Sequence, residues 1–246
     1  MHQLKQLYRS NYAGESVVTS LTLSSGEWIP EVETVPNSVF NTHSTTQAIA
    51  IGNGESRRTV DLSFIKNHKG GLLAADKLQS YGCNALYRDF EPDFLVAVGN
   101  TIVKEIADSG YTNDHIVYTT GENLIAYPGK FYLIPQNLHY DSGAIAAYLA
   151  AFDGHTKVFL LGYDGYDTPG PVNNLYKDTN GYPSSTEIHD EAFWNRSLEQ
   201  VIKTYSDVDF VSIMPVKSWY IPVQLDRLPN FRQIDFREFI IEADLG

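Results

Sequence analysis

From residue 46 onward, short apolar runs alternate with segments that have helical periodicity. The apolar or aromatic runs predict strands at 47–51, 81–84, 94–98, 115–119, 131–134, 157–161 and 208–213. Most of these runs are continuous rather than alternating, which is typical of strands that are covered on both faces. The pattern therefore predicts a parallel sheet buried between two helical layers.

Three helices are predicted between these strands. Asn100 can cap the first helix, which ends at Gly110. Ser142-Gly143 opens the second, whose small residues would let it lie close against the sheet. The third spans about 187–205, with an inner side formed by Phe193, Leu198, Val201 and Ile202. This alternation predicts an α/β fold: a single Rossmann-like, doubly wound and mainly parallel sheet.

Two segments do not follow the strand–helix alternation. Residues 1–45 are polar and rich in Ser and Thr, and they are predicted to be an N-terminal extension or arm that could hold a hairpin. The main domain then covers 46–246. Within it, the interval of about 165–188 is rich in Gly, Pro and Asn and too long for an ordinary connection, which predicts a lid loop. The mixed tail beyond residue 215 receives no assignment.

Composition limits the classes of function. A hydrophobic content of 43% excludes wholesale disorder, and a net charge of −12 argues against a nucleic-acid surface. An anionic nucleotide could still bind through backbone N–H groups. Cys83 is the only cysteine, so neither a disulfide within the chain nor a cysteine metal cluster is expected. The sequence has no signal-peptide core and no apolar run near the ~20 residues of a membrane span, which predicts a cytoplasmic protein.

The strand at 47–51 runs directly into Gly52-Asn53-Gly54-Glu55-Ser56. Gly52 and Gly54 permit positive φ and close backbone approach to a ligand, and Asn53 lies where open α/β sheets bind ligands. Arg57 replaces the third glycine of a dinucleotide motif, and the ending of a P-loop is missing. The turn is therefore either a plain bend or a nucleotide site of another kind.

Further polar candidates follow other strands. Asn84 and Asn100 could converge with Asn53 at one sheet edge, although each alone could be a turn or cap residue. Asp164 could be a metal ligand, a ribose acceptor or a turn former. The lid tyrosines could donate to a leaving phosphate or simply cover the core; they are Tyr166, Tyr176 and Tyr182.

Two histidines lie near predicted helix starts. His189 and His139 could accept a proton near neutral pH, or could be ordinary surface residues. The chain contains no H-E-x-x-H, C-x-x-C or G-x-S-x-G motif, which argues against zincin, thioredoxin-type and lipase-type chemistry.

Taken in order, these motifs resemble the bacterial sialyltransferases of glycosyltransferase family 42. The resemblance covers about 46–213 and runs from the Gly52–Ser56 turn through Asn84, Asn100, Ser142-Gly143 and Gly162–Tyr166 to His189. It implies a GT-A-like variant of the fold and an inverting, metal-independent transfer from a CMP-activated sugar to a glycan acceptor. No cofactor is implied beyond this donor substrate.

The resemblance also implies roles for individual residues. His189 would be the general base, and Tyr166 and Tyr176 would hydrogen-bond the departing phosphate, with Tyr182 as a substitute. Ser142 would face the sugar carboxylate. The nucleotide and donor would be bound by Gly52, Asn53, Gly54, Asn84, Asn100, Ser142, Gly143 and Asp164.

Two departures from the family pattern leave the donor sugar open. His139 stands where the family usually carries an arginine, which weakens the case for sialic acid, and Asp141 replaces a threonine. The expected partners are a nucleotide sugar and a glycan acceptor, without nucleic acid. Homo-oligomerisation and peripheral membrane association are left open.

Two other functions compete with this interpretation. The same motifs are similar to pterin pyrophosphokinase-like and flagellin-glycosylation accessory proteins; a pyrophosphokinase would need Mg²⁺, for which Asp164 and Asp167 are the best ligands. A non-catalytic module that binds a glycan or a partner protein is the third hypothesis. It predicts that His189 points away from the Asn53 pocket.

Overall fold

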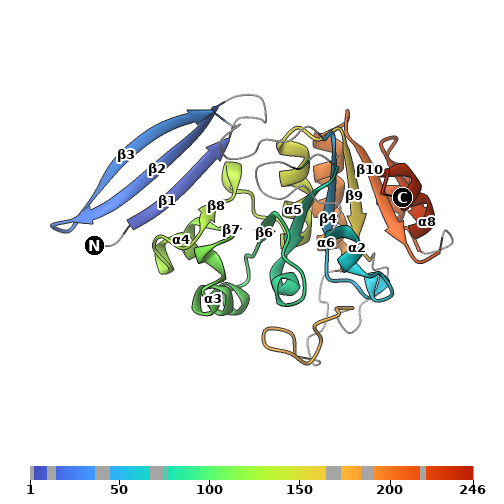
Figure 1. Cartoon of the computed structure of the whole chain (residues 1–246), viewed down its shortest axis with the longest axis horizontal. Coiled ribbons are helices and arrows are strands. Elements are labelled where there is room, and N and C mark those ends of the chain that lie inside the picture. The colour runs from blue at the N-terminus through green and yellow to red at the C-terminus, as the bar shows by residue number, and fades with distance from the viewer. Residues whose placement is uncertain are drawn as a thin grey trace.

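A computed structural model of the chain describes residues 3–9, 15–36, 45–66, 75, 77–164, 173–183, 191–216 and 220–245. Most of them belong to an α/β body built on an eight-stranded sheet of order β11-β10-β9-β4-β5-β6-β7-β8 (Figure 1). Every neighbouring pair in this sheet is parallel. The predicted Rossmann-like, doubly wound α/β fold is confirmed.

The predicted strands all correspond to strands of this sheet. Their bounds are β4 (Gln47–Ile51), β5 (Gln79–Cys83), β6 (Phe94–Val96), β7 (Ile116–Thr119), β8 (Tyr132–Leu133), β9 (Lys157–Leu161) and β10 (Asp209–Met214). The eighth strand, β11 (Phe231–Asp235), belongs to the tail that the sequence left unassigned. It pairs in parallel with β10 and extends that edge of the sheet.

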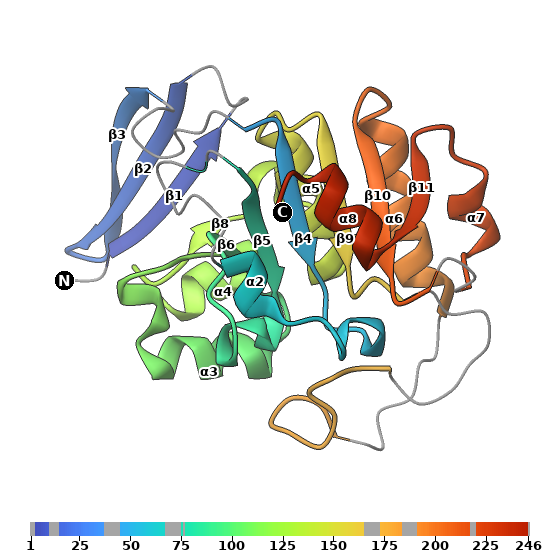
Figure 2. The same cartoon turned by 45° about the vertical axis from the view of Figure 1, so that its right-hand side comes forward.

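Helices cover both faces of the sheet, as Figure 2 shows. One face packs against α2 (Leu62–Lys66), α3 (Asn100–Ser109) and α8 (Phe236–Glu242), and the other against α5 (Ser142–Phe152), α6 (Glu191–Thr204) and α7 (Val223–Asp226). The short α4 (Gly121–Ala126) follows β7. The single-turn helices are η1 (Glu55–Arg57), η2 (Asn84–Arg88), η3 (Tyr111–Asn113) and η4 (Pro135–Asn137).

Alternation along β4 divides the core into two layers. Ile49 and Ile51 pack on the face of α2, α3 and α8, whereas Ala48 and Ala50 face α5. Apart from Gly143, every residue of α5 is buried, and the helix contacts β4, β5, β6 and β9. Small side chains on both sides permit this close approach, which confirms the prediction for the second helix.

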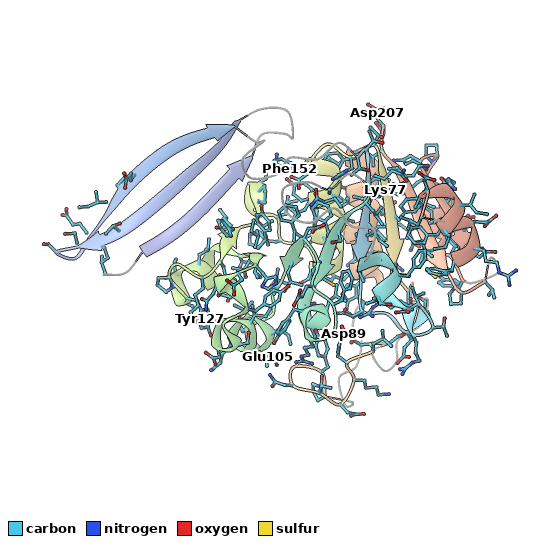
Figure 3. All side chains as sticks on the ribbon, viewed as in Figure 1. Lys77, Asp89, Glu105, Tyr127, Phe152 and Asp207 are labelled. Atoms are coloured by element: carbon cyan, nitrogen blue, oxygen red, sulfur yellow. The ribbon has the colours of Figure 1, made fainter. Side chains whose placement is uncertain are left out.

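The strand order locates the place where a ligand would be expected. From β4 the chain adds β5 to β8 on one side, and then returns to place β9 against the other side of β4. The direction of winding therefore reverses between β4 and β9, and open α/β sheets bind ligands outside the carboxyl ends of the strands at such a reversal. In Figure 3, Asp89 and Glu105 lie toward this end of the molecule, whereas Phe152 and Asp207 lie at the opposite end.

The N-terminal segment forms a separate antiparallel sheet of order β1-β2-β3 (Figure 1). Its strands are β1 (Gln3–Arg9), β2 (Glu15–Ser24) and β3 (Glu27–Pro36), and β1 lies beside β8 and α4. The predicted boundary between residues 45 and 46 falls just before β4. No helix among the described residues has the length and apolarity that crossing a membrane requires.

Two local predictions are wrong. The residue that caps α3 is Gly99, and Asn100 is the first residue of the helix itself. Phe193 is 41% exposed rather than on the inner side of α6, although Leu198, Val201 and Ile202 are buried as predicted. Helix α6 is described from Glu191 onward, inside the predicted range.

Candidate functional site

The loops that follow β4 and β9 are joined through their backbones. The Gly52 N–H donates to the Leu161 carbonyl (2.8 Å) and the Gly54 N–H to the Gly162 carbonyl (3.0 Å). A Cβ on Gly52 would lie 2.5 Å from the Gly162 oxygen. Neither Gly52 nor Gly54 has a positive φ, which corrects that expectation. Their missing side chains serve the contact between loops.

Asp164 ties the same two loops together through its side chain. The Ser56 N–H donates to Oδ2 (2.9 Å), the Ser56 hydroxyl donates to Oδ1, and the Asn173 amide donates to Oδ2 (2.9 Å). Asn173 in turn accepts from the Glu55 N–H (2.8 Å). Burial raises the pKa of Asp164, and the Ser56 hydrogen bonds oppose this rise. Both carboxylate oxygens are thus engaged in holding the Gly52–Ser56 turn.

Three predicted site residues are linked through the carboxyl end of β5. Asn53 is 7% exposed and donates to the Cys83 carbonyl (3.2 Å). Asn84, the next residue, accepts a hydrogen bond from the Ser142 hydroxyl (2.8 Å), and its φ of 51° lies in the left-handed region that asparagine tolerates. Among the described residues, no hydrogen bond links exposed Asn100 to this group.

The N-terminus of α5 is capped by a carboxylate. Asp141 precedes Ser142 and accepts from the Ala144 N–H (3.0 Å), where the positive end of the helix dipole favours an anion. Burial raises the pKa of Asp141 to about 6, against the effect of the backbone N–H groups of Ala144 and Gly143. Gly143 accepts from the Tyr163 hydroxyl (2.7 Å). Ser142, at the start of α5, was predicted to face a sugar carboxylate. This end of the helix already binds the carboxylate of Asp141.

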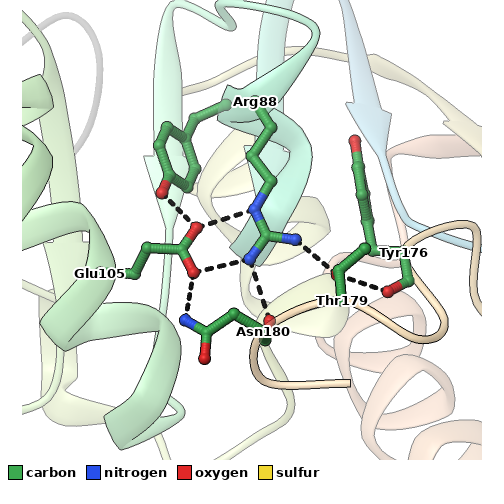
Figure 4. Close-up of polar contacts among 6 residues, drawn as sticks. Arg88, Glu105, Tyr176, Thr179 and Asn180 are labelled. Atoms are coloured by element: carbon green, nitrogen blue, oxygen red, sulfur yellow. Dashed lines mark hydrogen bonds and ion pairs between the residues drawn. The ribbon is translucent and has the colours of Figure 1, made fainter. Parts of the chain in front are cut away.

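Part of the predicted lid is docked against the body. Residues 173–183 contact the site through the Leu175 N–H, which donates to the Asn53 carbonyl (2.9 Å). Figure 4 shows how Arg88 holds this segment: its guanidinium donates twice to Glu105 (2.7 Å each), to the Thr179 hydroxyl (2.7 Å) and to the Asn180 carbonyl (2.9 Å). Asn180 also donates to Glu105. The predicted site residues Tyr166 and His189, like Asp167, lie outside the described residues.

Tyr176 is held within a charged network. Its hydroxyl donates to Asp89 Oδ1 (2.5 Å) and accepts from Arg57 Nη2 (3.0 Å). The guanidinium carbons of Arg57 and Arg88 lie 5.7 and 5.6 Å from the centroid of its ring. Burial and then Asp89 raise its pKa. Donation to a departing phosphate, the predicted role, would require this phenol to leave Asp89. Tyr182 packs 6.2 Å from the Tyr176 ring, and His139 is exposed.

The residues that organise this network were not selected from the sequence. Arg57 was noted only because it replaces a motif glycine, and a charged residue directly after a buried turn was the available signal. Arg88, Glu105 and Asn173 carry no local pattern, since their partners are far away in the chain. No group of three or more metal-ligating side chains occurs among the described residues.

The Arg88–Glu105 contact predicts a specific acid response. Hydrogen bonds from Arg88 are the main cause that lowers the pKa of Glu105 from 4.5 to about 2. The stabilisation is therefore complete above pH 4.5, the unfolded value, and is lost as the pH falls toward 2. Glu105→Gln should be less stable than the parent at pH 7 and should lose less stability between pH 4.5 and 2, as measured by urea unfolding.

Glu122→Gln is the matched control, because Glu122 is exposed on α4. It should follow the parent at every pH. Arg232 also lowers the pKa of Glu242 to about 2, so part of the loss of stability at acid pH comes from Glu242. Both variants retain this part. An unchanged slope of stability against pH in Glu105→Gln would contradict the assignment.

Comparison with known proteins gives one distant likeness. No protein-family model matches the chain, and no curated protein matches it. A solved structure that matches is the crystal structure of alpha-2,3-sialyltransferase from Campylobacter jejuni in apo form, with 11% sequence identity and a TM-score of 0.42. The match covers 68% of this chain and 75% of that chain. A likeness at this level carries no argument about activity.

Proposed function

We propose that this protein is a glycosyltransferase-like enzyme that transfers a sugar from a CMP-activated donor to a glycan acceptor without a metal ion. One observation carries the proposal. Asn53, Asn84 and Ser142, which the motif resemblance assigns to the donor, are connected through the end of β5, beside the reversal of the sheet between β4 and β9. Ligands of open α/β sheets bind at this position.

The chemistry of these groups suits a nucleoside monophosphate. Amide side chains donate and accept hydrogen bonds without adding charge, which fits a base or a ribose. The monophosphate carries less charge than a diphosphate, so phenol and backbone donors can replace a cation. On this proposal the acceptor hydroxyl loses its proton to His189 and attacks the anomeric carbon from the face opposite the phosphate. The sugar–phosphate bond breaks, and CMP leaves with the electron pair.

The proposal predicts binding of CMP in the absence of metal. CMP at about 100 times its dissociation constant should stabilise the protein by about 2.7 kcal/mol, equally with and without EDTA, in a thermal unfolding experiment. Asn53→Ala should lose most of this stabilisation. Asn113→Ala should retain it, because Asn113 is exposed in η3, next to the start of β7. A shift with Mg-ATP and none with CMP would reject the proposal in favour of a pyrophosphokinase.

Asp164 weighs against that alternative. A pyrophosphokinase would use Asp164 as a Mg²⁺ ligand, whereas here both of its oxygens accept hydrogen bonds from Ser56 or Asn173. Metal binding would have to break the tie between the two loops.

A further inference from the structure

A cavity lies beside the Gly52–Ser56 turn. It has a volume of about 440 Å³ and lies between the residues that follow this turn, the start of α2 and the docked segment 173–183. The residues that determine its chemistry are Arg57, Arg58, Asp61, Asp89, Leu175 and Tyr176. Its volume falls within the range of about 300–1,000 Å³ that is usual for small-molecule sites.

Arg57 is the unusual member of this lining. It is 3% exposed, and its guanidinium donates to the Gly52 carbonyl (2.7 Å) and the Tyr176 hydroxyl (3.0 Å), which are both uncharged. Within the described parts of the chain, no carboxylate forms an ion pair with it. Exposed Asp89 connects to it only through the Tyr176 phenol.

A buried arginine is rarely left without an ionic partner, because removing its charge from water is costly. A guanidinium has five N–H donors, so two hydrogen bonds leave donors for a ligand in the cavity that Arg57 lines. Arg58, with a side chain 61% exposed, adds a second cation at the same cavity and can reach a ligand by releasing its surface partner Glu55. These groups favour an anion.

The remaining lining specifies more than an anion. Asp61 is a carboxylate at neutral pH, and hydrogen bonds from Ser63 lower its pKa further. Asp61 and Asp89 both line the cavity, and carboxylates accept hydrogen bonds from hydroxyl groups. Leu175 supplies apolar surface. A simple anion would pair with the arginines alone. An anion that also carries hydroxyl groups would pair with the arginines through its charge and donate hydrogen bonds to Asp61 and Asp89 through its hydroxyl groups.

We propose that this cavity binds a small polyhydroxylated anion, such as a sugar bearing a phosphate or a carboxylate, with Arg57 as the residue that contacts the anionic group. None of Asn53, Asn84 and Ser142 lines this cavity, so we treat it as a second site. It does not depend on the proposed transferase activity.

Isothermal titration calorimetry with four probes tests the proposal: glucose 6-phosphate, glucuronate, glucose and inorganic phosphate. At least one of the two sugar anions should bind about tenfold or more tightly than both glucose and inorganic phosphate. The stronger of the two identifies phosphate or carboxylate as the recognised group. Affinity should fall at high salt, because the contact is ionic. Equal affinity of all four probes, or no binding, would overturn the proposal.

Variants locate the binding. Arg57→Met should abolish it, but this change also removes the contacts with Gly52 and Tyr176, so far-ultraviolet circular dichroism must show that the variant folds. Arg58→Gln leaves those contacts intact and should weaken binding about threefold to tenfold. Arg237→Gln, an exposed arginine on α8, should bind like the parent. Parental affinity in Arg58→Gln and in a folded Arg57→Met would reject the site.

Competition with CMP separates this proposal from the proposed function. CMP is also a hydroxylated anion, and the two ligands should bind simultaneously if the cavity is a second site. Displacement of the sugar anion by CMP would overturn the two-site proposal. If CMP does not bind at all and the sugar anion still binds, the proposed function is rejected. The cavity then remains a binding site for a polyhydroxylated anion.

Discussion

Gly52→Ala is expected to lower the free energy of unfolding by about 3 kcal/mol, the upper end of the usual range for overpacking. The new Cβ would lie 2.5 Å from the Gly162 carbonyl oxygen, which belongs to the backbone and cannot rotate away. Relief of this overlap would separate the two loops and break the hydrogen bonds from Gly52 to Leu161 and from Gly54 to Gly162. Urea unfolding followed by circular dichroism measures the loss.

Two other glycine variants calibrate this result. Gly121→Ala should change stability by less than about 0.5 kcal/mol, because its Cβ would contact only a Leu133 methyl group at 3.8 Å. Gly54→Ala would meet the Asp164 carboxylate at 2.5 Å, which is a side chain and can move. Its cost should lie between the other two. A Gly52→Ala protein as stable as Gly121→Ala would contradict the loop contact.

His189→Ala is expected to reduce kcat for sugar transfer by about 10²–10⁴-fold, the usual contribution of a general base. The expectation rests on the motif resemblance, which assigns this histidine to the acceptor hydroxyl. CMP binding should be unchanged, because the Asn53–Asn84–Ser142 group does not include His189. The rate is measured as CMP release from a panel of CMP-activated sugars with and without glycan acceptors.

Asn113→Ala serves as the control, since Asn113 is exposed in η3, next to the start of β7. It should retain both activity and CMP binding. Full activity in His189→Ala would show that His189 is not the general base. It would leave the proposed CMP site at Asn53, Asn84 and Ser142 unaffected. Loss of CMP binding in the same variant would instead place His189 among the nucleotide ligands.

Most strands of the central sheet could be predicted because they are short, mainly apolar runs that are buried on both faces. β11 was missed for a physical reason: its sequence, Phe-Arg-Gln-Ile-Asp, belongs to an edge strand in which only Ile234 is fully buried. Its burial pattern lacks the continuous apolar signal of the inner strands. Edge strands of this kind depend on pairing with a neighbour rather than on local composition.

The sequence predicts those site residues that follow the ends of neighbouring strands. It does not predict those that are held by hydrogen-bond partners from a distant segment of the chain. Asn53 and Asn84 follow β4 and β5, which are neighbours in the sheet, and their proximity follows from parallel pairing. Asn100 looked equivalent but lies exposed, one strand farther along. Arg57 and Asp164 each have one partner in the segment 173–183, Tyr176 and Asn173, and nothing in the local sequence indicates how that segment docks.

The pairing of β4 with β9 also sets when the site can form during folding. Gln47 pairs with Lys157, so β4 has a neighbour on only one side until nearly two-thirds of the chain has been synthesised. Contacts between residues so distant in sequence form slowly, because a long loop must close before the contact stabilises anything. The Gly52–Ser56 turn needs Gly162 and Asp164 for its shape, so the ligand site should be among the last parts of the protein to reach its native structure.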